Sequence, residues 1–239
     1  MKRMKFYLCA MAAAALVGAN VRADDTASIS GKIAFEGTPP RMKKITVDAD
    51  PKCAEMHADT PLRQEEVVVN PNSTLKWVFV YIKSGLPDGK TYDVPSTPVE
   101  LDQKGCHYEP HVFGMMAHQH LKIVNKDDTL HNIHAMPTKS AEFNVGQPNQ
   151  GMETLKTFAN PEIMVHFKCD VHPWMSAYVG VTDNPFYSVT GDDGTYKITG
   201  LPAGTYTVET WQEKYGTQDA TVTVGAGEAK TADFTYKAE

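Results

Sequence analysis

The sequence lacks the short motifs that mark several common enzyme classes. It contains no Gly-x-Ser-x-Gly, no phosphate-binding glycine loop and no His-Glu-x-x-His, which argues against serine-hydrolase, P-loop and zinc-protease chemistry. It also lacks Cys-x-x-Cys-His, so covalent haem is excluded by motif. The acidic pair Asp192-Asp193 precedes Gly194 in a predicted turn, with no partner for acid/base work. We therefore expect no enzyme activity.

Long apolar runs are equally scarce. The one clear run, Phe6–Val17, follows a basic start and is followed by Val21-Arg-Ala23, a pattern typical of a secretory signal. We expect residues 1–23 to be a signal peptide that is cleaved after Ala23. No second run approaches the roughly 20 apolar residues that span a bilayer. The sequence thus predicts a periplasmic or secreted protein without a transmembrane segment.

Basic side chains are in the minority. Without the expected signal peptide, 19 Lys and Arg face 29 Asp and Glu, which gives a net charge of −10. A strongly acidic surface repels the phosphate backbone. Nucleic acid is therefore not an expected partner.

Short segments with alternating polarity, separated by Gly, Pro, Asp and Asn, predict an all-β protein. In residues 24–92, strands are predicted at 28–35, 43–47 and 75–82, and residues 50–65 form a polar loop with room for one helical turn. The strand at 75–82 is apolar on both faces, which predicts a central, covered position. Residues 93–183 contain a second group of closely spaced strands, as in a β-sandwich.

One stretch in this second group combines three possible metal ligands. Cys169-Asp-Val-His172-Pro-Trp-Met175 offers a thiolate, an imidazole and a thioether within seven residues. The segment 163–169 alternates so that Cys169 is carried inward at the end of a buried strand. A further imidazole, His131, follows the polar turn 125–129. Two His, one Cys and a Met suit a copper ion that cycles between Cu(I) and Cu(II).

Cys169-x-x-His172-x-x-Met175 with an upstream His131-Asn132 resembles the cupredoxin (blue copper) family, and its short ligand loop is most similar to that of the amicyanins. The resemblance implies a Greek-key β-sandwich over residues 93–183 that holds one type 1 copper. It implies His131, Cys169 and His172 as equatorial ligands and Met175 as the long axial ligand.

The resemblance also implies roles for residues around the ligands. Asn132 is expected to tie the two ligand segments together through a hydrogen bond from its backbone N–H to the Cys sulfur. Asp170 stands where relatives often carry Ser or Thr, so the hydrogen bonds around the Cys169 sulfur are expected to differ from those of the relatives. The ring edge of His172 is expected to meet solvent beside Pro173 and Trp174, as the route for electrons. Met136 is expected to extend that apolar patch, although Trp174 and Met136 are equally consistent with ordinary core residues.

Cysteine counting agrees with this assignment. Without the expected signal peptide, Cys53, Cys106 and Cys169 remain, an odd number in an oxidising compartment. If Cys169 is a copper thiolate, Cys53 and Cys106 are free to form a disulfide. The alternative is a zinc or second copper site that combines these two cysteines with nearby histidines, but the spacing fits no standard finger pattern. The histidines in question are His57, His107 and His111.

Three other histidines have weaker claims to a functional role. His134 lies three residues beyond His131 and is expected in the outer shell or at the surface, since the equivalent residue of the family is not a ligand. His118 and His120 share one face of a predicted strand. They are consistent with a weak second metal site, but a solvated face is the simpler interpretation.

Residues 184–239 have a different pattern of hairpins. The Asp193-Gly194 turn, the segment Leu201-Pro-Ala-Gly204-Thr-Tyr206 and the pair Tyr215-Gly216 resemble the prealbumin-like carboxypeptidase regulatory-like domain, a small β-sandwich. That family opens with strands similar to those predicted in residues 24–92. We therefore expect a split domain, 24–92 with 184–239, around a cupredoxin domain at 93–183, with two contiguous domains in series as the alternative.

Taken with the resemblance, the sequence predicts a periplasmic copper protein that transfers single electrons between redox partners such as a c-type cytochrome or a dehydrogenase. Two other functions remain open. One is a copper-binding carrier or sensor that passes the metal on, and the other is a non-redox interaction module of the cell envelope.

Overall fold

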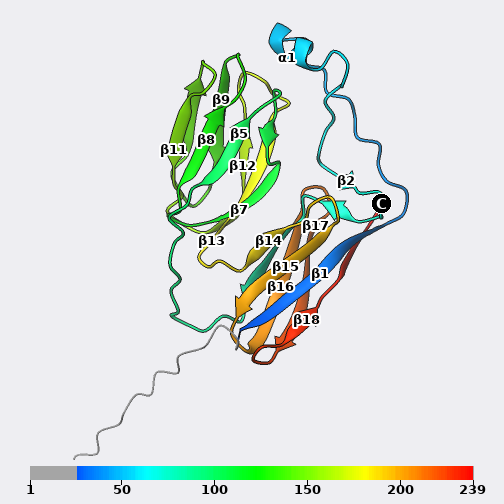
Figure 1. Ribbon diagram of the computed structural model, residues 1–239, viewed down its shortest axis with the longest axis vertical. Helices are drawn as coiled ribbons and strands as arrows, with labels where there is room; N and C mark the ends of the chain where they lie inside the picture. The colour runs from blue at the N-terminus through cyan, green and yellow to red at the C-terminus, as the bar shows by residue number, and fades with distance from the viewer. Residues whose placement is uncertain (1–25, 239) are drawn as a thin grey trace, which may run out of the picture.

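The computed structural model describes residues 26–238, so the expected signal peptide lies outside the described residues. The chain folds almost entirely into β-strands (Figure 1). Within residues 26–238, no helix is long and apolar enough to cross a membrane. The elements are β1 (Ala27–Glu36), α1 (Pro51–Met56), β2 (Val68–Val69), β3 (Leu75–Lys76), β4 (Phe79–Ser84), β5 (Val99–Gln103), β6 (Tyr108–Glu109), β7 (Val112–Met116), β8 (Leu121–Asn125), β9 (His131–Met136), β10 (Phe143–Gln147), β11 (Glu153–Lys156), β12 (Glu162–Lys168), β13 (Ser176–Thr182), β14 (Tyr187–Val189), β15 (Thr195–Leu201), β16 (Gly204–Gln212), β17 (Gly216–Val224), β18 (Ala229–Thr231) and β19 (Phe234–Lys237).

The middle of the chain forms one β-sandwich. Its first sheet has the strand order β10-β9-β12-β13-β7 and its second has the order β11-β8-β5-β6. Most neighbours are antiparallel, but β13 pairs with β7 in parallel and β5 pairs with β8 in parallel. The alternating apolar residues of both sheets meet in one buried core that includes Leu101, Ile123, Ile133 and Phe167. This core includes Cys169 and Met175, the first and last residues of the loop that follows β12.

Strands from both ends of the chain build a second sandwich. β1 pairs with β15 on one side and with β18 and β19 on the other, while β4 lies between β14 and β16. The core between these sheets contains Ile29, Ile33, Val80, Tyr206 and Tyr236. The predicted central position of the strand around residue 80 is therefore confirmed. The predicted continuous strand at 75–82 is interrupted, because Trp77 adopts a left-handed backbone conformation (φ 64°) between β3 and β4.

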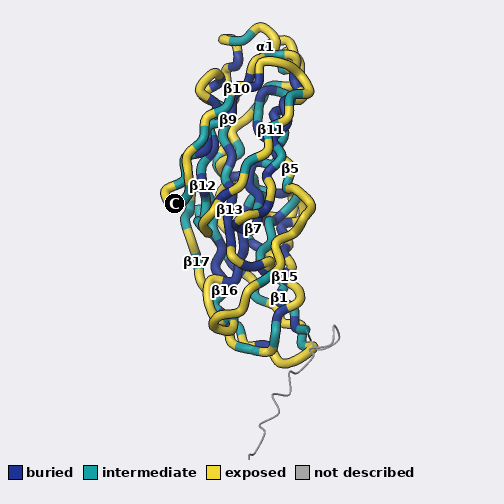
Figure 2. The backbone as a smooth tube through the Cα atoms, turned by 90° about the vertical axis from the view of Figure 1, so that its left-hand side faces the viewer, coloured by how far each residue is buried: buried dark blue, intermediate teal, exposed yellow. Residues whose placement is uncertain are grey.

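The two sandwiches pack on each other through β4 and β14 on one side and β7 and β13 on the other. Phe79 is fully buried at this junction. A Cβ atom placed on Gly180 would lie only 2.3 Å from the Phe79 ring, and one on Gly114 would lie 2.4 Å from Tyr187. The two glycines face each other across the β7–β13 pair, so the bare strand surface allows the aromatic rings to approach. The result is an elongated molecule with buried segments running through its length (Figure 2).

A long segment between β1 and β2 leaves the second sandwich and reaches the first. It runs along one side of the molecule to α1, which lies beside the top of the first sandwich (Figure 1). The strand predicted at 43–47 is reduced to one isolated bridge between Lys44 and Arg63. The helix begins where Asp50 caps the N–H groups of Lys52 and Cys53, with Pro51 at its first position, as Pro favours. This segment brings Asp50 and Cys53 to the ligand loop.

Candidate metal centre

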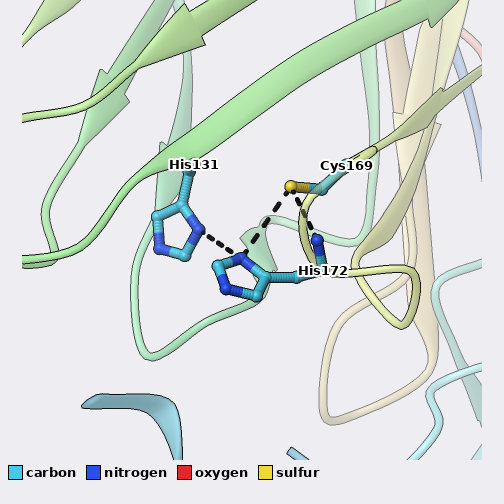
Figure 3. A group of neighbouring side chains, drawn as sticks. All are labelled: His131, Cys169 and His172. Carbon is cyan, nitrogen blue, oxygen red and sulfur yellow. Dashed lines mark hydrogen bonds between the residues drawn. The ribbon is translucent and has the colours of Figure 1, made fainter. Parts of the chain in front are cut away.

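Three of the four predicted ligands lie together at one end of the first sandwich (Figure 3). The ligand atoms of His131, Cys169 and His172 all lie within 4.8 Å of one another, and all three side chains are buried. The two Nδ1 atoms of the histidines are 2.9 Å apart, and Cys169 Sγ lies 3.9 Å from Nδ1 of His172. The three side chains therefore face one common point.

The strand register explains why these residues meet. β9 begins at His131, and β12 pairs with it so that Lys168 lies opposite His134. Cys169 follows directly after β12, on the inward side that the alternation predicts. The loop from Cys169 to Met175 is closed by a backbone hydrogen bond of 3.3 Å from the N–H of Cys169 to the carbonyl of Met175. The compact loop thereby returns His172 toward the strand that carries His131.

The surroundings of Cys169 favour its thiolate. Burial raises the pKa of the thiol, but hydrogen bonds with His131 and His172 and with the backbone N–H groups of Asn132 and His172 outweigh it, and the pKa falls to about 6. The N–H of His172 lies 3.3 Å from the sulfur. At neutral pH the group is therefore largely ionised, which is the form that binds a metal.

Asn132 links the segment that carries His131 to the loop that carries Cys169, and it does so through its side chain, whereas the resemblance implies a link through its backbone N–H. Its side-chain oxygen accepts hydrogen bonds from the N–H groups of Asp170 (2.6 Å) and Val171 (3.3 Å). The same oxygen lies 3.1 Å from Cys169 Sγ, and the Asn132 carbonyl accepts a 2.6 Å bond from the Tyr108 hydroxyl. The side chain thus holds the ligand loop against β9.

Asp170 contributes to this link only through its backbone. Its carboxylate faces outward, where it pairs with Lys168 (2.9 Å) and accepts hydrogen bonds from Asn144 (2.6 Å) and His134 (2.9 Å). His134 also donates to Glu142 at 2.7 Å. The structure therefore places His134 in a partly exposed ionic cluster on the outer side of β9, away from the ligand atoms.

The expectation that the edge of His172 meets solvent is wrong. The residue is only 1% exposed, because the segment that carries α1 covers it. Its Nε2 atom lies 3.0 Å from a carboxylate oxygen of Asp50 and 3.8 Å from Sγ of Cys53. Sequence patterns could not reveal this contact, since Asp50 is separated from His172 by 122 residues.

His131 has a similar carboxylate partner. Its Nε2 atom lies 2.9 Å from Asp127, which is buried and also accepts 2.8 Å hydrogen bonds from the N–H groups of Gly105 and Cys106. Burial lowers the pKa of His131, but the hydrogen bond to Asp127 raises it above its ordinary value. Asp127 lies in the predicted polar turn before His131, and its four-residue spacing is the only sequence signal for the contact.

The disulfide between Cys53 and Cys106 is present, with 5.7 Å between the Cα atoms. It fastens the α1 segment to the first sandwich. Of the histidines considered for an alternative site with these cysteines, His57 lies 2.7 Å from the carbonyl oxygen of Gly105, and His111 lies 2.7 Å from Glu213. Because both sulfurs are used in the disulfide, the zinc or second copper site at this position is excluded. His118 and His120 are exposed.

The predicted apolar patch is only partly assembled. Pro173 is exposed, and Trp174 is half-buried with its ring centroid 5.0 Å from that of His172. The indole N–H donates to the Cys106 carbonyl at 2.9 Å, and the ring lines a cavity of about 260 Å³. Met136 lies at the opposite end of β9 from His131, so the strand carries it away from the ligand end. The structure therefore leaves Pro173 and Trp174 beside the site without Met136.

The donor set fits copper. It offers a soft thiolate that is ionised at neutral pH and two imidazole nitrogens that point to the same place, in a buried environment. Met175, the predicted axial ligand, is fully buried in the same loop, and its N–H donates to the His172 carbonyl at 2.9 Å. A hard, oxygen-preferring cation would find no suitable set among His131, Cys169 and His172.

Comparisons with known proteins return one family model and several solved structures. Residues 172–237 match the family model of the carboxypeptidase regulatory-like domain. No curated protein matches the chain. One similar solved structure is the Cu-containing nitrite reductase of Thermus scotoductus SA-01, at 19% identity and a TM-score of 0.34 over 42% of this chain and 26% of that chain. Another is a purple cupredoxin from Nitrosopumilus maritimus, at 19% identity and a TM-score of 0.30 over 35% of this chain and 98% of that chain. A third is a mutant of amicyanin in the Cu(I) form, at 18% identity and a TM-score of 0.32 over 43% of this chain and 97% of that chain.

The chain thus spans about a quarter of the length of the nitrite reductase chain. Identity and TM-score are low for all three structures. The metal site is therefore inferred from the geometry of the ligand residues alone.

Proposed function

We propose that the protein would hold one copper ion with His131, Cys169, His172 and Met175 and that it transfers single electrons. The observation that carries the proposal is the convergence of one buried thiol of low pKa and two buried imidazoles within 4.8 Å. Copper bound by such a set cycles between Cu(I) and Cu(II) at a type 1 site. The loop from Cys169 to Met175 acts here as a short ligand loop of the amicyanin kind.

The protein matrix would supply a site that changes little between the two oxidation states. The backbone N–H of His172 holds the Cys169 sulfur, and Asn132 fixes the loop against β9. His131 and His172 are 0% and 1% exposed, so water is kept from both rings. Fixed ligands and an excluded solvent limit the rearrangement that accompanies electron transfer.

Trp174 offers a route for the electron now that the His172 edge is covered. Its ring contacts that of His172 and reaches the cavity that Pro173 also lines. Glu65 and Glu66 line the same cavity, together with Arg63 and with Glu213, which is paired with His111. These features favour a redox partner with a basic docking surface, such as a c-type cytochrome or a dehydrogenase, in an oxidising compartment outside the cytoplasm, as the disulfide favours.

The burial of both histidines bears on the alternatives. A copper carrier or sensor must release its metal, so it needs ligands that an exchange partner can reach. The burial of His131 and His172 therefore speaks against this function. A non-redox envelope module requires no metal, and the lowered pKa of a buried thiol between two histidines is not needed for a scaffold.

The visible spectrum of the protein reconstituted with Cu(II) tests the proposal. An intense thiolate-to-copper band is expected, and Cys169→Ser should abolish it. His134→Ala is the matched control, because His134 is three residues from His131 but faces the outer ionic cluster; its band should be unchanged. A wild-type protein that binds Cu(II) without this band, or binds none, would overturn the proposal.

A further inference from the structure

Each of the two site histidines directs its outer nitrogen at a carboxylate. Nε2 of His131 lies 2.9 Å from Asp127, and Nε2 of His172 lies 3.0 Å from Asp50. A carboxylate only accepts hydrogen bonds, so both Nε2 atoms carry the proton. Both Nδ1 atoms are thereby left to face each other, 2.9 Å apart, and Cys169 Sγ. The hydrogen bond between the two Nδ1 atoms takes one further proton in the metal-free protein, and a bound metal would replace that proton. The two carboxylates select the ring form that presents Nδ1 to a metal.

Each carboxylate accepts a hydrogen bond from the backbone N–H of one of the two disulfide-bonded cysteines. Asp127 accepts from the backbone N–H of Cys106 at 2.8 Å. Asp50 accepts from the N–H of Cys53 at 3.3 Å, from the N–H of Lys52 at 2.7 Å and from the Thr129 hydroxyl at 2.8 Å. The bond between Cys53 and Cys106 therefore joins the two backbone segments that orient the carboxylates.

Asp50 does not belong to the sandwich that carries the ligands. It lies in the segment between β1 and β2, which starts from the other sandwich. The segment reaches the site as an added cover, and its contact with His172 closes the ring edge from solvent. One sandwich therefore supplies the ligand atoms, and a segment from the other completes their surroundings.

We propose that Asp50 and Asp127 are positioning residues that fix the Nδ1-facing form of His172 and His131, and that their two negative charges stabilise the higher oxidation state of the bound metal. The second half of this inference rests on the proposed copper function, whereas the first half holds for the metal-free protein. A carboxylate on the outer nitrogen makes an imidazole a more basic ligand, and loss of such a partner typically weakens metal binding by about 10- to 100-fold. Negative charge nearby favours Cu(II) over Cu(I), which lowers the reduction potential.

The first test uses metal-free protein labelled with ¹⁵N in its histidines. Long-range NMR correlations should show a proton on Nε2 of both rings in the wild type. Asp50→Ala should change the signals of His172 more than those of His131, and Asp127→Ala should do the reverse, since the two rings also contact each other. Asp128→Ala is the matched control, because this exposed neighbour pairs with Lys52 and not with either ring. A wild-type protein with the proton on Nδ1 alone, or variants with unchanged rings, would refute the positioning role.

The second test uses the copper-loaded protein. Asp50→Asn and Asp127→Asn keep an acceptor oxygen but remove the charge, and Asn still caps a helix such as α1. Each is expected to raise the reduction potential and to increase the dissociation constant of Cu(II) by about 10- to 100-fold, with the thiolate band retained. Asp128→Asn should change neither value. If Asp50→Asn and Asp127→Asn keep the reduction potential and the Cu(II) affinity of the wild type, as Asp128→Asn should, the electrostatic role is overturned.

The two tests separate the possible failures. If the wild type shows no thiolate-to-copper band, the proposed function fails, and the NMR experiment still decides whether the carboxylates position the rings. If the band is present but Asp50→Asn and Asp127→Asn behave as Asp128→Asn does, the proposed function stands and the role of the carboxylates is refuted.

Discussion

Sγ of Cys53 lies 3.8 Å from Nε2 of His172, although the two residues are 119 positions apart. Cys53 belongs to α1, and its bond to Cys106 is the only disulfide within residues 26–238. The disulfide therefore both closes a loop of the chain and holds a cover over His172, one of the proposed copper ligands.

We expect removal of this disulfide to lower stability and, under the proposed copper function, to weaken retention of the metal. The variant Cys53→Ala/Cys106→Ala should lose about 2–5 kcal/mol of unfolding free energy, because the unfolded chain is no longer constrained. It should also release Cu(II) to a chelator faster, since the cover over His172 is no longer fastened. Denaturant unfolding of the metal-free protein and chelator kinetics of the loaded protein measure the two effects. Unchanged release kinetics would show that α1 stays in place without the disulfide.

The junction of the two sandwiches depends on two glycines, Gly114 and Gly180, which have no side chain and so leave room for aromatic rings. Gly180→Ala should destabilise the protein by about 1–3 kcal/mol, the usual cost of overpacking, because the new methyl group would lie 2.3 Å from the Phe79 ring. Gly146→Ala in β10 is the control, since no atom lies within 4 Å of a Cβ there. Thermal or denaturant unfolding of both variants gives the comparison. An equal stability of the two would mean that Phe79 moves aside at no cost.

A second junction contact predicts a pH dependence. His111 donates from Nε2 to Glu213 at 2.7 Å and from Nδ1 to the Ser176 carbonyl at 3.0 Å. Both partners only accept, so the geometry requires the doubly protonated ring. Burial lowers the pKa of His111, but the hydrogen bond and the charge of Glu213 raise it above the ordinary 6.5.

A raised pKa in the folded protein stabilises it fully below the unfolded value of about 6.5, and this contribution is lost as the pH rises through the folded pKa. We expect Glu213→Gln to cost about 1.5–3 kcal/mol near pH 6, the usual value for a hydrogen bond to a charged group. The difference from the wild type should shrink toward pH 9. Unfolding free energies measured across this range test the prediction, and a constant difference would contradict it.

The sequence was informative where neighbouring residues determine the structure. The alternation before Cys169 fixes which side of β12 faces the core, so the burial of Cys169 follows from a local pattern. The Cys53–Cys106 pairing followed from the odd cysteine count once Cys169 was set aside. The prealbumin-like hairpins were recognised from turn residues, whose conformational demands are local.

The sequence was uninformative where distant segments meet. The cover over His172 depends on Asp50, which reaches the site through a segment of irregular structure with no periodic pattern. The interruption of the strand at Trp77 is likewise caused by tertiary contacts. The Trp77 backbone N–H donates to the Thr190 carbonyl, and its indole N–H donates to Glu65. Such contacts override strand propensity, so the predicted continuous strand and the predicted exposed His172 edge were both wrong.

The ring of Trp174 provides the last prediction, which rests on the proposed electron transfer. Trp174→Leu should slow the oxidation of the Cu(I) protein by a c-type cytochrome several-fold, because it removes the aromatic contact between His172 and the cavity surface. Trp174→Phe keeps a ring and should have a smaller effect. Stopped-flow kinetics at the thiolate band measure the rates, and the band itself should keep its position in both variants.

Val171→Ala is the matched control for this experiment. Val171 is the exposed residue on the other side of His172, and it is 42% exposed. If electrons leave through Trp174, the Val171 variant should react at the wild-type rate. If Val171→Ala slows the reaction as much as Trp174→Leu does, the partner docks over the loop tip instead, and the route through the aromatic contact is refuted.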